Sequence, residues 1–162
     1  NVVGLKFFNV YGPNEYYKGD MASVAWKAYN TILQTGAFQL FRSHRDDYED
    51  GEQKRDFVYV KDCSQIMWWL LNTTNVHGIF NVGSGKARSW NDLLRAVFSS
   101  MKREPRITYI DMPDSLQNQY QYFTEAPIEK LRGAGYTAPL HSLEEGIGDY
   151  IQNHLCKENP HW

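Results

Sequence analysis

The sequence is poor in the residues that build disulfide frameworks and metal centres. Its two cysteines, Cys63 and Cys156, lie far apart and have no other cysteine or histidine at metal-ligand spacing. The five histidines are scattered, and no H-E-x-x-H motif occurs. We therefore interpret both cysteines as reduced thiols and assign no metal site.

Long apolar runs and an excess of one charge are also absent. No apolar run approaches the roughly 20 residues of a membrane-spanning helix, and the first residues do not resemble a signal peptide. The formal net charge is −2, with both signs dispersed along the chain. Such a balance gives no electrostatic footprint for nucleic acid. These features predict a cytoplasmic protein that binds neither nucleic acid nor membrane.

Glycine-rich cofactor turns are a third absence. Neither G-x-G-x-x-G nor G-x-x-G-x-x-G, which a dinucleotide-binding turn requires, occurs in the chain. The stretch NVGSGKARS departs from a phosphate-binding loop, since Phe80 stands at the first glycine position and Ala87 at the final hydroxyl position. We interpret Gly83 and Gly85 as a turn, and we do not expect this chain alone to hold a nicotinamide cofactor.

Apolar residues make up 42% of the chain, which is enough for a packed core. Strand-like and helix-like segments alternate, and this pattern predicts an α/β fold. The strands are expected at residues 2–10, 38–41, 56–60, 78–82 and 107–110. The helices are expected to begin at the caps Asp20, Asp62 and Ser89 and at a Ser142–Glu145 capping box, and one more helix is expected to carry Pro127 in its first turn.

Two polar stretches follow apolar strands and carry candidate binding groups. In FFNVYGPNEYYKGDMAS, Lys18 lies in a loop with three tyrosines, and in KRDFVYVKD, Arg55 stands at the start of a short strand. An arginine there can bind a diphosphate with two parallel hydrogen bonds. The residue types alone favour plainer interpretations: a solvated Lys18, and a surface ion pair between Arg55 and Asp56.

Four stretches taken in order carry a more specific signal: FFNVYGPNE, KGDMAS, RDFVYVKD and GIFNVGSG. Together they resemble the C-terminal half of extended short-chain dehydrogenase/reductases that act on nucleotide sugars. Within that group, NVYGPNEYYKGDMASVAWKAY and QYQYFTEAPIEKLRGAGY are most similar to the ADP-glycero-manno-heptose 6-epimerases. The resemblance covers nearly the whole chain.

This resemblance implies an organisation for the chain. Residues 1–162 would form the C-terminal substrate-binding portion together with the last strands of a Rossmann-type sheet. The N-terminal cofactor-binding half, with its glycine-rich turn and catalytic Tyr-x-x-x-Lys, would be absent. A start inside an apolar run, without an initiator methionine, also leads us to expect a fragment.

The resemblance further implies a reaction and the residues for it. ADP-D-glycero-D-manno-heptose would be inverted at C6 by NADP-dependent oxidation and re-reduction, in lipopolysaccharide core synthesis. Lys18 would be one of two acid/base groups, and Val10 and Lys18 would contact NADP. The implied substrate contacts are Asn9, Asp20, Lys27, Phe41, Arg42, Ser43, Arg55 and Tyr120.

Some features depart from the family pattern and leave alternatives open. Asp20 and Lys27 replace a serine and a histidine that are common in the family, and the acidic stretch HRDDYEDGEQK lengthens the loop before Arg55. The precise sugar is therefore open. The alternatives are another nucleotide-sugar epimerase or dehydratase, and a non-catalytic nucleotide-sugar binding module.

Three expectations concern the complete enzyme. Partial burial among Tyr11, Tyr16 and Tyr17, or a nearby cation, would lower the pKa of Lys18 toward neutrality. The complete protein would form a homo-oligomer, a pentamer or larger, as family members do. The 162 residues alone would be inactive.

Overall fold

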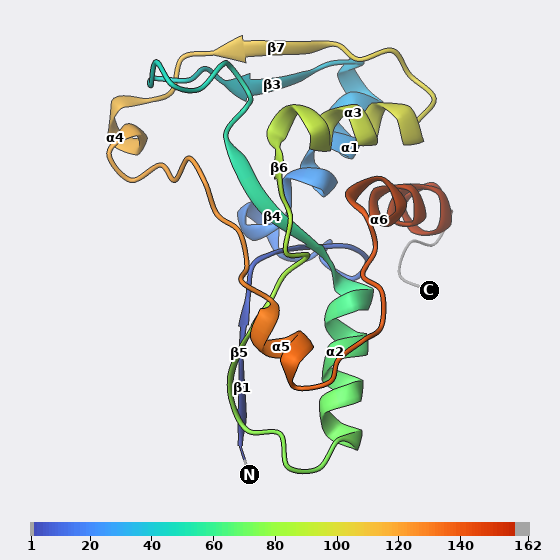
Figure 1. The fold of residues 1–162 in the computed structure, drawn as a ribbon. Helices are drawn as coiled ribbons and strands as arrows, with labels where there is room; N and C mark the ends of the chain where they lie inside the picture. The colour runs from blue at the N-terminus through green and yellow to red at the C-terminus, as the bar shows by residue number, and fades with distance from the viewer. Residues whose placement is uncertain (1, 158–162) are drawn as a thin grey trace.

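The computed structural model describes residues 2–157 and has an α/β fold (Figure 1). Its longer helices are α1 (Val24–Thr35), α2 (Val60–Asn72), α3 (Trp90–Ser100) and α6 (Leu143–Tyr150). Short helical turns lie at η1 (Gly19–Met21), α4 (Asp114–Gln117), α5 (Glu129–Gly133) and η2 (Ile151–Leu155). None of the helices in residues 2–157 is long and apolar enough to cross a membrane.

The described strands form three small sheets. Strand β1 (Val3–Phe7) pairs in parallel with β5 (Gly78–Val82), and β3 (Phe38–Phe41) pairs in parallel with β7 (Ile107–Ile110). Between them, β4 (Lys54–Tyr59) pairs in parallel with β2 (Asn9–Tyr11) and antiparallel with β6 (Ala87–Ser89). Figure 1 shows β1 and β5 at the end near the N-terminus and β3 and β7 at the other end, with β4 running between.

The predicted single strand over residues 2–10 is wrong, because the chain changes sheets at Phe8. The Phe8 N–H donates to the Val82 carbonyl at 3.0 Å, at the end of the β1–β5 pair. Two residues later, the Val10 N–H donates to the Phe8 carbonyl at 2.9 Å, and β2 turns to pair with β4. The break directs Asn9 and Val10 away from the first sheet.

Local signals placed some helix ends correctly and others one or more residues off. Ser89 and Ser142 form the capping boxes of α3 and α6, and Gly36 ends α1 with a φ of 78°. The predicted cap Asp20 is wrong, since the Ser23 hydroxyl accepts from the Trp26 N–H and caps α1. Asp62 does not cap α2 either; it lies inside the first turn of that helix.

Two apolar clusters hold the fold together. The larger one packs α1, α3 and α6 around β4, and its fully buried members include Ile32, Leu94, Phe98, Ile147 and Tyr150. The smaller one lies between α2 and β5 and extends to residues 131–140. The larger cluster thus sets the position of β4, and β4 carries Arg55.

The buried Asp56 carboxylate organises the turn predicted at Gly83 and Gly85. It accepts from the Ser84 N–H at 2.6 Å, the Ser84 hydroxyl at 2.8 Å, the Gly85 N–H at 2.9 Å and the Ala126 N–H at 2.9 Å. Asp56 is 0% exposed, so its carboxylate depends on these donors in place of water. The turn is therefore built on β4 itself.

An Asp56→Asn substitution is expected to lower the free energy of unfolding by about 3 kcal/mol, because an amide NH2 would replace one oxygen that accepts two hydrogen bonds. Urea unfolding of the 162-residue chain measures this change. The exposed Asp46 gives the matched control, and Asp46→Asn is expected to change stability by less than about 0.5 kcal/mol. Equal stability of the two variants would contradict the role of Asp56.

Candidate functional site

The candidate site centres on an apolar pocket of about 480 Å³ beside β3. This volume lies within the range of small-molecule sites. Helix α1 contributes Val24 and Thr31, and β3 contributes all four of its residues. The remaining lining side chains are Trp90, Ile110 and Tyr120. A pocket of this size walled by aromatic rings suits a flat heterocycle.

Arg55 lies next to this pocket, clamped between two aromatic side chains. Its guanidinium lies 5.3 Å from the centroid of the Tyr120 ring and 5.7 Å from that of Trp90. The residue is only 7% exposed, and its Nη1 donates to the Lys54 carbonyl at 2.8 Å. The stacked rings fix the plane of the guanidinium, so its remaining N–H groups point in set directions.

The surface ion pair between Arg55 and Asp56 is absent, so that interpretation is wrong. The Asp56 carboxylate instead accepts hydrogen bonds from Ser84, Gly85 and Ala126. Among residues 2–157, no carboxylate lies within ion-pair distance of Arg55. Burial lowers the pKa of Arg55, although an arginine stays charged at neutral pH. A desolvated cation without a carboxylate partner favours binding of an anion.

Tyr120 is held against Arg55 by the segment that follows it. This segment runs along β4, where the Lys54 N–H donates to the Tyr122 carbonyl at 2.8 Å and the Thr124 N–H donates to the Lys54 carbonyl at 3.2 Å. The Tyr120 ring meets Phe41 edge-on at 6.5 Å. Burial raises the pKa of Tyr120 and the Arg55 guanidinium opposes that shift, so the phenol stays neutral at pH 7.

Arg42 and Ser43 begin the long acidic loop, and both interact with Asp50 of that loop. The Ser43 N–H donates to Asp50 at 2.8 Å, and the Arg42 guanidinium lies 3.9 Å from Asp50 and 3.4 Å from Asp111. Asp47 forms a 2.6 Å ion pair with Arg45. The extra carboxylates of this loop are thus partly neutralised by its own arginines, which reduces their repulsion of a nearby anion.

Asn9 and Val10 reach the site through β2. Asn9 is in register with Phe57, and Val10 with Val58. Phe57 packs against Trp90 at 5.1 Å, so the face of the sheet that carries Asn9 also carries Phe57 and Arg55. The predicted substrate contacts Asn9 and Arg55 therefore lie on one face of the sheet, and Tyr120 contacts Arg55.

Lys18 lies on the loop between β2 and α1, and its side chain is exposed. The three tyrosines expected around Lys18 differ in their burial, and Tyr16 is half-buried and packs against the larger apolar cluster. Tyr11 is 3% exposed and stacks on Tyr59 at 5.4 Å inside the core, whereas Tyr17 is 81% exposed. The lowered pKa expected for Lys18 in the complete enzyme stays a prediction.

Val10 and Lys18, the two residues of the predicted cofactor contact, also line a small cavity. The cavity measures about 20 Å³ and is closed by Tyr11, Glu15 and neighbouring residues. That volume holds about one water molecule. A nicotinamide ring does not fit this cavity, and the cofactor contact of Val10 and Lys18 stays a prediction.

Asp20 and Lys27 lie together near Lys18. The Lys27 amine donates to the Asp20 carbonyl at 2.6 Å. The structure therefore sorts the predicted residues into two groups: Phe41, Arg55 and Tyr120 at the pocket, and Val10, Lys18, Asp20 and Lys27 around the loop after β2.

Sequence reasoning missed Trp90, which forms a wall of the pocket and supports Arg55. Its position depends on the antiparallel pairing of β4 with β6, where Arg55 is in register with Arg88. The one available signal was an aromatic residue directly after the helix cap Ser89. Glu15 was also missed, because a single acidic residue in a loop shows no sign of burial in the sequence.

Comparison with known proteins links this geometry to a family. The sequence profile of the NAD dependent epimerase/dehydratase family matches residues 1–83, just over half of the 162 residues. An ADP-L-glycero-D-manno-heptose-6-epimerase of Nitratidesulfovibrio vulgaris (strain Hildenborough) is 58% identical over 160 residues, which is 99% of this chain and 50% of that protein. A Fusobacterium nucleatum protein of the same name is 51% identical over 162 residues.

Solved structures show the same relationship. The chain matches the crystal structure of Helicobacter pylori ADP-L-glycero-D-manno-heptose-6-epimerase with a TM-score of 0.76 and 35% identity, over 94% of this chain and 44% of that one. Thermus thermophilus UDP-glucose 4-epimerase in complex with NAD matches with a TM-score of 0.71 and 24% identity, which shows a shared fold. The chain spans about half the length of the curated relatives that it matches.

Proposed function

The chain belongs to the NAD dependent epimerase/dehydratase family, and from that premise we propose that it supplies the substrate-binding portion of an ADP-glycero-manno-heptose 6-epimerase. The observation that carries the proposal is Arg55, a buried guanidinium without a carboxylate partner in the described chain, stacked beside a pocket of about 480 Å³. This combination of a charged group and an apolar pocket matches a nucleoside diphosphate.

The proposed substrate lies across both groups of residues. The adenine occupies the pocket between β3 and Trp90, and Arg55 binds the diphosphate with Tyr120 beside it. Phe41, Arg42 and Ser43 border the nucleotide. Asn9 contacts the heptose, and Asp20 and Lys27 shape the sugar end near Lys18.

Lys18 provides the acid/base group of this chain. Inversion at C6 requires that the hydroxyl on that carbon lose its proton and later regain it, and an amine on an exposed loop can reach that oxygen. A bound NADP would supply the hydride acceptor and donor; we propose that polypeptide outside these residues holds it, with Val10 and Lys18 forming the adjoining wall. The 162 residues alone are then inactive.

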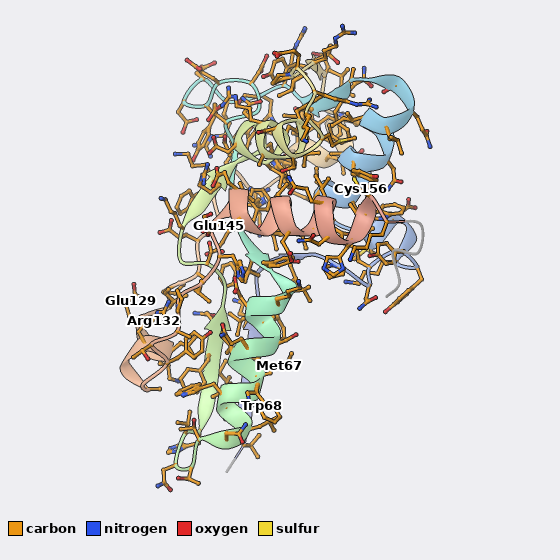
Figure 2. The ribbon with its side chains drawn as sticks, turned by 90° about the vertical axis from the view of Figure 1, so that its right-hand side faces the viewer. Met67, Trp68, Glu129, Arg132, Glu145 and Cys156 are labelled. Carbon is orange, nitrogen blue, oxygen red and sulfur yellow. The ribbon has the colours of Figure 1, made fainter. Side chains whose placement is uncertain are left out.

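The open edge of β1 supports the proposal that residues 1–162 are one portion of a larger fold. Among the described strands, β1 pairs with β5 alone, so its other edge offers unpaired backbone groups. Apolar side chains flank that region: Leu71 is 81% exposed and Trp68 68%, and Figure 2 shows Met67 and Trp68 on the outer part of α2. Such a surface favours coverage by further polypeptide.

The proposed setting follows from the substrate. We place the reaction in the cytoplasm, where it would serve lipopolysaccharide core synthesis, and we expect the complete enzyme to assemble as a pentamer or larger ring. Sedimentation of the complete enzyme measures that assembly state.

A chimera tests the proposed function. We would replace the matching 160 residues of the Nitratidesulfovibrio relative with this chain and follow conversion of ADP-D-glycero-D-manno-heptose to its L-glycero epimer by NMR. Conversion within about tenfold of the parent rate is the expected result, since 58% identity preserves the fold and the site. The relative itself and a chimera carrying Arg55→Met are the controls.

Two other functions remain as outcomes of the same experiment. Turnover of a UDP- or GDP-sugar in preference to the ADP-sugar, or loss of water from the sugar, would indicate another epimerase or a dehydratase. Binding of ADP-sugar without any turnover in a folded, NADP-loaded chimera would indicate a non-catalytic binding module.

A further inference from the structure

The loop between β2 and α1 is closed by one buried carboxylate. Glu15 is 3% exposed, although it lies in the middle of a polar loop. Its Oε1 accepts from the Gly12 N–H at 3.3 Å and from the Ser23 hydroxyl at 2.8 Å, and its Oε2 accepts from the Ser23 N–H at 2.6 Å. Gly12 and Ser23 are the first and last residues of the loop, so Glu15 joins its two ends.

The same carboxylate fixes the loop to the core. The Tyr150 hydroxyl on α6 donates to Glu15 Oε1 at 3.0 Å, across 135 positions of sequence. Tyr150 is fully buried, and burial together with the adjacent Glu15 raises the pKa of its phenol. The phenol therefore keeps its proton at neutral pH and donates it to Glu15.

Lys18 depends on this arrangement through its backbone. The Lys18 N–H donates to the Glu15 carbonyl at 3.0 Å, and the Met21 N–H donates to the Lys18 carbonyl at 3.0 Å. The Lys18 side chain is exposed, and the residue is the N-cap of the short turn η1. Its position relative to the rest of the molecule is thus set by how firmly the ends of the loop are tied.

We propose that Glu15 is a positioning residue for Lys18, acting by tying both ends of the Gly12–Ser23 loop to each other and to α6. This inference rests on the proposed function, in which Lys18 moves a proton. Four charge-assisted hydrogen bonds to one buried group hold a loop more firmly than its few apolar contacts can. The carboxylate thereby holds the backbone of Lys18 in place relative to the end of β2.

A Glu15→Gln substitution in the chimera tests the proposal. An amide has one accepting oxygen, so at least one of the loop-end donors would face an NH2 group. The expected result is a kcat at least tenfold lower, with KM for the ADP-sugar within threefold, because Arg55 and its pocket are untouched. Hydrogen exchange of the amides of residues 16–22 in the 162-residue chain is expected to be at least tenfold faster.

Two control variants separate an effect on the position of Lys18 from an effect of lowered overall stability. Ile147→Val, at a fully buried core position outside the loop, is expected to lower Tm and to keep kcat within twofold. Tyr150→Phe removes only the link to α6 and is expected to have a smaller effect on kcat than Glu15→Gln. A Glu15→Gln enzyme with kcat within twofold of its parent, or a fall in kcat that Ile147→Val reproduces, would overturn the proposal.

The hydrogen-exchange measurement distinguishes a failure of this proposal from a failure of the proposed function. An inactive parent chimera would count against the epimerase assignment, whereas unchanged exchange of residues 16–22 in Glu15→Gln would count against the tie itself. Hydrogen exchange needs no substrate and no cofactor, so it measures the local stability of the loop whether or not the chimera is active.

Discussion

Replacing Arg55 with methionine is expected to weaken binding of the ADP-sugar at least about 100-fold, since two charge-assisted hydrogen bonds to a diphosphate are lost together. Arg55 has no carboxylate partner within the described chain that the substitution would leave unpaired. A methionine keeps contact with the rings of Trp90 and Tyr120, so the free energy of unfolding is expected to stay the same or to rise. Calorimetric titration of the chimera with ADP measures the loss.

Arg42→Met is the matched control for this experiment. The Arg42 side chain is 55% exposed and already lies near Asp50 and Asp111, so its removal is expected to weaken binding only a few-fold. Arg55→Lys restores the charge without the planar fork and is expected to fall between the two. If Arg55→Met binds ADP within threefold of its parent, Arg55 does not hold the diphosphate.

Replacing Lys18 with methionine is expected to lower kcat of the chimera by about 100- to 10,000-fold, the range for loss of an acid/base group. Affinity for ADP is expected to be unchanged, because the pocket and Arg55 lie on other elements. Stability is expected to change by less than about 0.5 kcal/mol, since the Lys18 side chain is exposed. Steady-state rates and urea unfolding measure the two effects.

Lys86→Met removes another exposed amine, at the turn after β5, and serves as the control. It is expected to keep the parent rate, which would show that a change of net charge alone does not slow the reaction. A normal epimerisation rate in Lys18→Met would assign the proton transfer to a different group. A parallel loss of ADP affinity would instead indicate a damaged loop.

The features that the sequence predicted well are set by neighbours along the chain. Ser89 and Ser142 form capping boxes because the partner in each case lies three residues away. Gly36 ends α1 because it adopts a positive φ at little cost. The cap of α1 was misassigned to Asp20, since Asp and Ser compete as caps and only the turn at η1 selected Ser23.

By itself, the sequence determined the α/β class, most of the strands and the family resemblance, because these follow from periodicity, caps and short motifs. Only the tertiary structure decided the surroundings of Arg55 and Glu15. Arg55 lies between two rings, without a carboxylate partner among residues 2–157, because β4 meets both β6 and the segment after Tyr120. Glu15 is buried because α6 packs against its loop. Burial and charge pairing depend on segments far apart in the chain, so no local pattern could reveal them.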